Sequence, residues 1–263
     1  MKFCTLASGS DGNCAVLSSE NCHILIDIGI SNRAICAGLE SIGISQDEIS
    51  AVFVTHEHGD HTRGLGVWAK KHKNCMYFAA PKTAENLRKD YQQIEVIAID
   101  KKTEFKNFEV TPLFTSHDTP DSVAYLFEFD GFKVMTLTDS GLVSDEIFEN
   151  MCGLDLLLIE TNYDKNMLKY GRYPQMLKER IAGECGHLSN DAGAEAAVYA
   201  ARHGCKCILL GHLSAENNTP KCAYETVHRY LLDAGIIPGV DVNLNVAPRG
   251  KVGVPVEIVK ETL

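Results

Sequence analysis

The residues with the clearest chemical potential in this chain lie together in the segment Thr55-His56-Glu57-His58-Gly59-Asp60-His61. Neutral imidazole nitrogens and carboxylate oxygens are the ligands that borderline divalent ions take in proteins. The apolar run at residues 51–54, just before the segment, predicts a buried strand. We therefore expect a metal centre presented at the carboxyl end of this strand.

The spacing within the segment suits two ions. In an extended or turning backbone, His56 and His58 point the same way and grip one ion. Asp60 and His61 follow Gly59 and reach a second ion, and two ions about 3.5–4 Å apart form a clamp for hydrolysis. The alternative is an exposed polar loop with chance histidines, which a lone histidine would favour but three histidines so close together do not.

Length and composition are those of an ordinary globular protein. The 263 residues are 45% hydrophobic and 23% charged, which suits one large or two small domains. The densest apolar run, at residues 154–159, is much shorter than a membrane span, and the apolar N-terminus meets Ser8-Gly9-Ser10 too soon for a signal peptide. Ten scattered cysteines without a zinc-knuckle pair favour reduced thiols. We expect a cytoplasmic protein with no membrane partner.

The chain is acidic overall but has one basic stretch. A net charge of −10 argues against passive binding of nucleic acid, although it does not exclude an enzyme that acts on nucleic acid. Within residues 165–180, one acid, Glu179, stands against five basic residues, which are Lys165, Lys169, Arg172, Lys178 and Arg180. A nucleic-acid contact and an ordinary solvated loop and helix face are both open interpretations of this stretch.

The N-terminal residues predict a hairpin whose loop can approach an anion. Strands are expected at residues 2–7 and 15–18 around Ser8-Gly9-Ser10-Asp11-Gly12-Asn13. Glycine and small residues let backbone amides come close to a phosphate, which makes Ser8, Ser10 and Asn13 candidate phosphate contacts. An ordinary hairpin loop is the favoured alternative.

Helix caps and apolar runs predict the elements that position these residues. Helices are expected from Ser31 to about residue 42, at 62–72, at 83–91, from Ser189 to residue 203, and from Thr219 to about residue 234. Further strands are expected at 23–29, 75–80, 95–100, 108–114, 123–129, 132–138, 154–161, 207–210, 240–247 and 254–259. No linker or low-complexity stretch divides the chain, so we expect one domain over residues 1–263.

Two copies of Gly-His-Leu-Ser, at residues 186–189 and 211–214, add further polar groups. The first copy precedes a predicted helix and the second ends a predicted strand, so their histidines should play different parts. A helix N-terminus favours an anion, which makes His187 and Ser189 candidates for contact with a phosphate. The remaining histidines lie outside any ligand pattern and are interpreted as structural; they are His23, His72, His203 and His228.

The pattern His-x-His-x-Asp-His in residues 56–61 resembles the metallo-β-lactamase superfamily. The resemblance implies an α/β (α+β) fold, a four-layer αββα sandwich of two mixed sheets flanked by helices, with the metal site on one edge. It also implies two sheet-plus-helix halves that meet near residue 140. The stretch between Asp139 and His212 is too short for the extra cap domain that some nucleases of this superfamily carry there.

The same resemblance implies seven metal ligands, which are His56, His58, Asp60, His61, His117, Asp139 and His212. The first two would share one ion with His117, and the next two would share the other ion with His212. Asp139 would bridge both ions; the commonest true β-lactamases carry cysteine there, which speaks against antibiotic hydrolysis. Asp27 would orient the metal loop from behind the ligands.

Within the superfamily, the chain is similar to the YycJ (WalJ) family. The similarity rests on residues 8–13, 55–61, 160–164, 186–190 and 211–214, of which the last three segments are the specific ones. Departures are Asp11, Thr161 and Tyr163, which stand where Ser, Ala and His are usual. The family is described as exonuclease-like and as acting on DNA from the 5′ end. The resemblance therefore implies a nucleic-acid substrate, with DNA favoured.

The implied reaction is hydrolysis by a hydroxide shared between two divalent ions. Zinc and manganese suit five histidines and two aspartates, and iron is also compatible. Asp60 would orient the hydroxide, and His187 would stabilise charge or protonate the leaving oxygen. A dinuclear hydrolase of thioesters, lactones or cyclic phosphodiesters is the alternative, and a non-catalytic scaffold is disfavoured because no ligand is missing. DNA against RNA, the polarity of digestion and the oligomeric state stay open.

Overall fold

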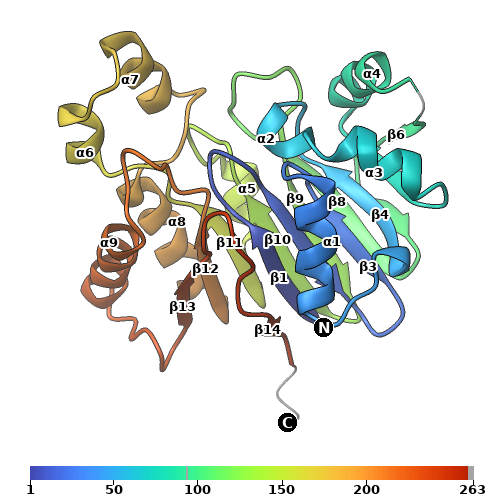
Figure 1. Ribbon diagram of the computed structural model, residues 1–263. Coiled ribbons are helices and arrows are strands. Elements are labelled where there is room, and N and C mark those ends of the chain that lie inside the picture. The colour runs from blue at the N-terminus through green and yellow to red at the C-terminus, as the bar shows by residue number, and fades with distance from the viewer. Residues whose placement is uncertain (93, 260–263) are drawn as a thin grey trace.

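Two seven-stranded sheets pack face to face in the computed structural model, which describes residues 1–92 and 94–259 (Figure 1). The first sheet contains, in spatial order, β14 (Val256–Glu257), β1 (Lys2–Ala7), β2 (Cys14–Ser18), β3 (His23–Ile26), β4 (Ile49–Val54), β5 (Met76–Ala79) and β6 (Val96–Ala98). The second contains β13 (Asn243–Val246), β12 (Cys207–Gly211), β11 (Leu156–Glu160), β10 (Phe132–Leu137), β9 (Val123–Phe129), β8 (Phe108–Phe114) and β7 (Thr103–Phe105).

Helices cover the outer face of each sheet. Those on the first sheet are α1 (Asn32–Ser41), α2 (Gly59–Thr62), α3 (Leu65–Lys71) and α4 (Pro81–Asp90), with a short 3₁₀ turn at Gln46–Glu48. Those that follow are α5 (Asp145–Asn150), α6 (Lys165–Tyr170), α7 (Gln175–Ala182), α8 (Asn190–Arg202) and α9 (Pro220–Asp233). Within the described residues, none of these helices has the length and apolar character needed to span a bilayer.

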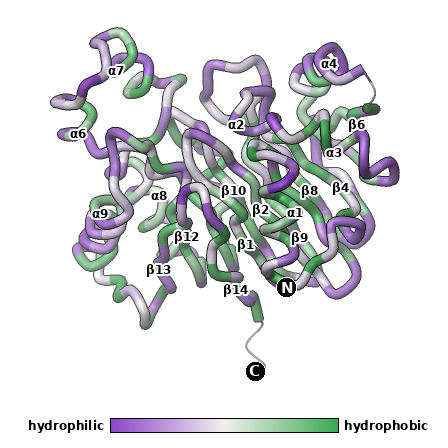
Figure 2. Tube along the Cα trace, in the orientation of Figure 1, coloured by the Kyte–Doolittle hydropathy of each residue, from purple (hydrophilic) through white to green (hydrophobic). Residues whose placement is uncertain are grey.

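Three apolar layers hold the sandwich together. The central layer lies between the sheets and joins residues such as Phe53 of β4 to Phe127 of β9, whose rings pack edge to face at 5.4 Å. Two outer layers lie between the sheets and the helices. Because β11 is covered on both faces, its residues are all buried and apolar up to Glu160, whereas outer surfaces are mainly hydrophilic (Figure 2). The expected αββα sandwich is confirmed.

Local sequence explains where the longer helices begin and end. The Ser189 hydroxyl accepts a hydrogen bond from Ala192 N at the start of α8, and Thr219 Oγ1 does the same for Cys222 N at the start of α9. Gly204, with φ +94°, follows α8 and supplies the left-handed conformation that ends it. The predicted caps of these two helices are confirmed.

The structure differs from the expectations in several places, among them the unexpected elements β7, α5, α6 and α7. Strands β7, β8 and β9 form an antiparallel meander with β10, so the second sheet begins near residue 103 and not near residue 140. The helix expected at residues 62–72 begins at Gly59 and is divided into α2 and α3, because Gly64 N donates to Ile28 O instead of continuing the helix. The last two expected strands are shortened to β13 and β14.

Parallel pairing places the carboxyl ends of the inner strands at one edge of the sandwich. Strands β3 to β6 are parallel in the first sheet, and β10 to β13 are parallel in the second. Asp27, Asp139 and His212 follow β3, β10 and β12, with φ angles of 58°, 57° and 55°. Non-glycine residues in this left-handed region are strained, and such residues concentrate at functional sites. The edge is therefore where the chemistry of this protein is expected.

Candidate metal centre

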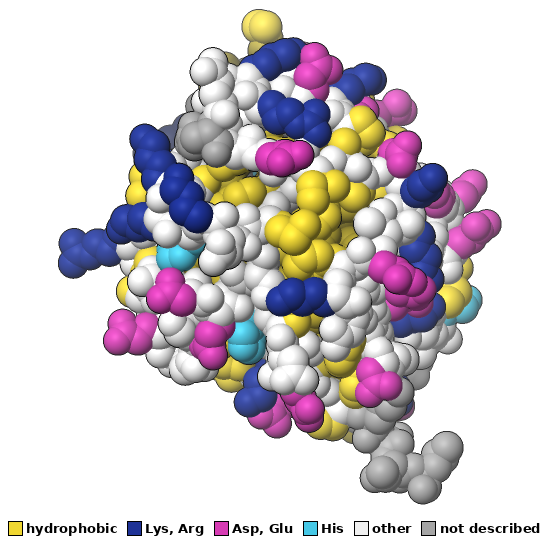
Figure 3. Space-filling model, turned by 90° about the vertical axis from the view of Figure 1, so that its right-hand side faces the viewer, with side chains coloured by type: hydrophobic (Ala, Val, Ile, Leu, Met, Phe, Trp, Pro, Cys, Tyr) yellow, Lys and Arg dark blue, Asp and Glu magenta, His cyan; other side chains and the backbone are white. Residues whose placement is uncertain are grey.

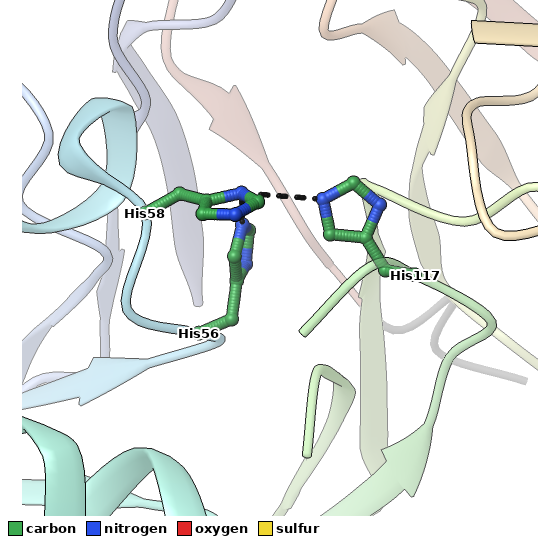
Figure 4. A group of neighbouring side chains, drawn as sticks. All are labelled: His56, His58 and His117. Carbon is green, nitrogen blue, oxygen red and sulfur yellow. Dashed lines mark hydrogen bonds between the residues drawn. The ribbon is translucent and has the colours of Figure 1, made fainter. Parts of the chain in front are cut away.

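The first group of metal donors consists of three histidines (Figure 4). His56 and His58 come from the loop between β4 and α2, and His117 comes from the loop after β8. His58 Nδ1 lies 3.1 Å from His56 Nε2 and 3.3 Å from His117 Nε2. Ring nitrogens that face one another at these distances need a shared proton or a shared cation between them. A single cation held by all three nitrogens suits this geometry.

The second group combines Asp60, His61 and His212, whose donor atoms all lie within 4.8 Å of one another. Asp60 Oδ2 is 3.6 Å from His61 Nε2 and 3.7 Å from His212 Nε2. Asp60 and His61 belong to α2, whereas His212 directly follows β12 in the other sheet. The group therefore forms only when both sheets are in place.

Asp139 lies between the two groups. Its Oδ2 is 3.0 Å from His61 Nε2, and its Oδ1 is 3.5 Å from His212 Nε2 and 3.8 Å from His117 Nε2. The side chain is buried, so these imidazoles are its environment. The structure thus brings all seven expected ligands to one edge, with Asp139 adjacent to both groups.

Four of the five histidines expected as ligands have an acceptor at one ring nitrogen. Asp27 Oδ2 lies 2.7 Å from His61 Nδ1, and Gly186 O lies 3.1 Å from His117 Nδ1. Thr55 Oγ1 is 3.0 Å from His56 Nδ1. An acceptor at one ring nitrogen holds the proton there and leaves the other nitrogen with a free lone pair that faces the site.

Asp27 also orders the metal-binding loop itself. Its Oδ1 accepts a hydrogen bond of 2.8 Å from Thr55 N, and Thr55 Oγ1 donates to the same carboxylate. A single buried carboxylate therefore holds both the first residue of the loop and the ring of His61. This is the orienting position that the family resemblance implied for Asp27.

The donor set fits a divalent metal. Among the described residues, His212 Nε2 and Asp139 Oδ2 are buried without a hydrogen-bond partner, although both point toward other donors of the site. Leaving such atoms unpaired is costly, and a cation at this position would satisfy both. Imidazole nitrogens combined with carboxylate oxygens are ligands for zinc, manganese and iron.

The electrostatics of the site favour positive charge. Burial raises the pKa of Asp139, but the charges of His212 and His61 outweigh it and hold that pKa well below its usual range. Burial lowers the pKa of His212, but the Asp139 charge and the adjacent carboxylates of Asp60 and Glu160 raise it to about 10. Metal ions compete with these protons, so metal binding must release them.

His187 stands beside this centre. Its Nδ1 is 2.8 Å from Glu160 Oε1 and 3.5 Å from Asp139 Oδ1, and its ring is partly exposed. His187 lies in the segment between α7 and α8, and its backbone N donates a hydrogen bond of 2.9 Å to Ile181 O. The ring is therefore close enough to the centre to contact a group bound there.

Glu160 belongs to this centre by its contacts, although the sequence did not lead us to assign it. It ends β11, it is fully buried, and its Oε1 lies 2.7 Å from His212 Nδ1 as well as 2.8 Å from His187 Nδ1. Its other oxygen accepts hydrogen bonds from the backbone N–H groups of Ser140 and Leu188. The signal was available, because Glu160 ends an apolar strand as Asp27 does.

The four candidate phosphate contacts take different places. Ser8 and Ser189 are buried, with Ser8 Oγ accepting from His212 N at 2.9 Å and Ser189 capping α8, so both are placed as supporting residues and not as contacts. Ser10 is exposed at the tip of its loop. Asn13 Nδ2 lies 3.1 Å from His61 Nε2 and therefore faces the centre.

Comparison with known proteins identifies relatives along most of the chain. Residues 23–212 match the family described as "Beta-lactamase superfamily domain". Exodeoxyribonuclease WalJ of Streptococcus pneumoniae is 36% identical over 246 residues, covering 91% of this chain and 91% of that protein. Exodeoxyribonuclease YycJ of Bacillus anthracis is 34% identical over 242 residues, covering 89% of this chain and 90% of that protein.

A solved structure shares the fold at a lower level of sequence similarity. The metallo-beta-lactamase fold protein YhfI of Bacillus subtilis superposes with a TM-score of 0.72 at 16% identity, over 96% of this chain and 98% of that one. This likeness concerns the fold alone, whereas the matches to WalJ and YycJ extend along nearly the whole sequence. The chain therefore belongs to the beta-lactamase superfamily and, within it, to the family that contains the WalJ and YycJ proteins.

Proposed function

We propose that this protein is a metal-dependent phosphodiesterase that degrades DNA as a 5′-to-3′ exonuclease. The observation that carries the proposal is the convergence of two donor groups on Asp139 at one edge of the sandwich, with His187 beside them. The names of the relatives that match nine-tenths of the chain, both exodeoxyribonucleases, support DNA as the substrate.

Two divalent ions, of zinc or manganese, fit the donors in this proposal. One would be held by His56, His58 and His117 and the other by Asp60, His61 and His212, with Asp139 shared. Ions bound there would supply a water molecule of lowered pKa and neutralise the charge on phosphate oxygens.

Asp60 is proposed to orient the attacking water. Burial raises the pKa of Asp60, but the nearby imidazoles of His212 and His61 outweigh it and lower that pKa, so the carboxylate is ionised at neutral pH. Its side chain is partly exposed, unlike that of Asp139. An ionised, accessible carboxylate accepts a hydrogen bond from water and directs the water lone pair toward phosphorus.

His187 is proposed as the general acid. Burial lowers the pKa of this imidazole, but the Glu160 carboxylate outweighs burial and raises that pKa. Because Nδ1–H donates to Glu160, the proton available for transfer is on Nε2. As water attacks phosphorus and the bond to the leaving oxygen breaks, Nε2 gives its proton to that oxygen.

The proposal is tested by digestion of DNA and RNA labelled at the 5′ or 3′ end, with protein reloaded with manganese or zinc. We expect loss of label from the 5′ end of DNA first, and no degradation by His58→Ala prepared in parallel. Cleavage of a small phosphodiester or thioester without degradation of any polymer would overturn the nuclease assignment in favour of a small-molecule hydrolase.

Three other expectations stay predictions. These are a single domain without a cap, a cytoplasmic location, and DNA in preference to RNA as the nucleic-acid substrate. The oligomeric state is left open by the sequence and by the fold.

A further inference from the structure

Residues 165–182, here called the arm, project from the sandwich as the helix pair α6 and α7 (Figure 1). They lie on the same edge as α2, which carries Asp60 and His61. Leu168 is the buried anchor of α6, whereas every side chain of α7 is exposed or half-buried. Tyr170 is 77% exposed and Met176 is 83% exposed. The arm therefore presents large side chains to solvent that the apolar core does not use.

Hydrogen bonds attach the arm at both ends, and the second attachment lies beside the metal centre. At its start, the Asp164 side chain caps α6 and Asp164 N donates to Asn217 O. At its end, the Arg180 guanidinium bonds to Asp118, whose Oδ1 lies 3.6 Å from His58 Nε2. The eight residues of α7 span about 12 Å, a length equal to about three stacked nucleotides of about 3.4 Å each.

The arm concentrates positive charge in an acidic protein. It contains five basic residues and one acid, whereas the whole chain carries a net charge of −10. Lys165 pairs with Asp191 and Arg180 pairs with Asp118. In the part of the chain that the structure describes, the other three make no ion pair with a carboxylate; they are Lys169, Arg172 and Lys178. By contrast, charges of both signs are mixed on the side of the molecule where β6 lies (Figure 3).

We infer that the arm binds a single nucleic-acid strand next to the scissile phosphate, an inference that rests on the proposed function. Tyr170 stacks on an unpaired base, because every base offers an aromatic face to an exposed ring. Lys169 lies over the Tyr170 ring at 5.3 Å, so aromatic and cationic groups meet at one point. Lys169, Arg172 and Lys178 contact the strand phosphates, which releases counterions and makes binding dependent on salt.

The inference separates substrates by size. A strand of twenty nucleotides contacts both the metal centre and the arm, whereas bis(4-nitrophenyl) phosphate contacts the centre alone. Variants of the arm should therefore lose activity on the polymer and keep activity on the small phosphodiester. A change that merely distorts the centre would lower both activities together.

The test uses Tyr170→Ala and the triple variant Lys169→Gln, Arg172→Gln, Lys178→Gln in the full chain. For single-stranded DNA, we expect kcat/KM to fall about tenfold or more for Tyr170→Ala. For the triple variant, the slope of log kcat/KM against log salt should become shallower by about 0.7 for each phosphate contact removed. Hydrolysis of bis(4-nitrophenyl) phosphate should stay within about twofold of the unmodified protein.

Matched controls remove equivalent groups elsewhere on the surface. Lys70→Gln, Lys71→Gln, Lys73→Gln removes three exposed lysines at α3, and Tyr224→Ala removes a partly exposed ring of α9. These controls should leave kcat/KM on DNA and its salt slope unchanged. A control that behaves like the arm variants would overturn a specific role for the arm.

Strand binding without catalysis distinguishes this inference from the proposed function. Fluorescence anisotropy of a labelled strand, with protein from which a chelator has removed the metal, measures strand binding by the arm directly. If the arm variants lose strand binding and the unmodified protein cleaves no polymer, the role of the arm is supported and the nuclease assignment is overturned. The opposite result is that the unmodified protein cleaves the polymer and the arm variants equal it in kcat/KM, salt slope and strand binding. This result would overturn the role of the arm and support the nuclease assignment.

Discussion

Glu160 Oε1 lies 2.7 Å from His212 Nδ1; Glu160 ends β11, and His212 directly follows the neighbouring parallel strand β12. The same oxygen is 2.8 Å from His187 Nδ1. One buried carboxylate therefore connects an expected metal ligand with the proposed general acid. Because it serves both, removal of its charge should affect metal binding and proton transfer together.

The Glu160→Gln variant tests this connection. An amide keeps the shape and one acceptor oxygen but loses the charge, so metal affinity should fall about 10–100-fold. The pKa of His187, which Glu160 raises against the effect of burial, should fall as well. The alkaline limb of the kcat profile should then move to lower pH, measured with saturating metal. A profile identical to that of the unmodified protein would remove His187 from the role of acid.

Removing His187 itself should leave the metal centre intact. His187→Ala should lower kcat about 100-fold or more, because general acid catalysis contributes that much, while metal content by elemental analysis stays unchanged. Asp139→Ala is the comparison, since it removes the carboxylate adjacent to both donor groups and should strip metal. Metal lost from His187→Ala would make this histidine a ligand instead.

Asp27→Asn isolates the charge of the supporting carboxylate. Asparagine tolerates the φ angle of 58° at this position and still accepts a hydrogen bond, so the fold should persist. Its amide cannot hold the His61 proton as a carboxylate does, and metal affinity should fall about 10–100-fold. Chelator competition measures the affinity, and circular dichroism checks the fold. An affinity equal to that of the unmodified protein would contradict the orienting role.

Metal loading should stabilise the protein more as pH rises from 6.5 to about 10. Burial lowers the pKa of His212, but the carboxylates of Asp139, Asp60 and Glu160 raise it from 6.5 to about 10 in the folded chain. Because this pKa is raised on folding, protonated His212 contributes to the stability of the metal-free protein. That contribution is fully present below pH 6.5 and is lost as pH rises through 10. Bound metal replaces that proton.

The measurement is the Tm of chelated and metal-loaded protein at pH 6.5, 7.5 and 9. We expect the difference in Tm to grow with pH, mainly because the chelated form melts earlier. His212→Gln removes one of the titrating imidazoles and should reduce the trend. A difference that shrinks with pH in the unmodified protein would show that His212 is not charged in the metal-free state.

Two glycines next to the metal loop should respond differently to substitution. A Cβ at Gly29 would lie 1.6 Å from Asp60 O, so Gly29→Ala must push the loop backbone away. We expect a loss of about 2–3 kcal/mol in the free energy of unfolding, together with weaker metal binding. Gly59→Ala is the matched control, because a Cβ there meets nothing within 4 Å. Urea unfolding compares the two, and equal stabilities would refute the close approach.

Much of the site could be read from the sequence because its signals are local. His56, His58, Asp60 and His61 lie within six positions after an apolar strand, and this spacing by itself indicates a metal centre. The caps Ser189 and Thr219 also act on residues only three positions away. Short-range patterns of this kind are set by backbone geometry and survive in any tertiary context.

Only the tertiary structure decided the partners that lie far apart in the chain. Glu160 reaches His212 across 52 positions, and Ser8 receives the His212 N–H across 204 positions. A buried polar atom takes whichever partner the packing of the two sheets brings within reach, and no local pattern encodes that choice. For the same reason, the sequence does not place the basic residues of the arm near the metal centre. Their position follows from the tertiary contact of Arg180 with Asp118, which lies beside His58.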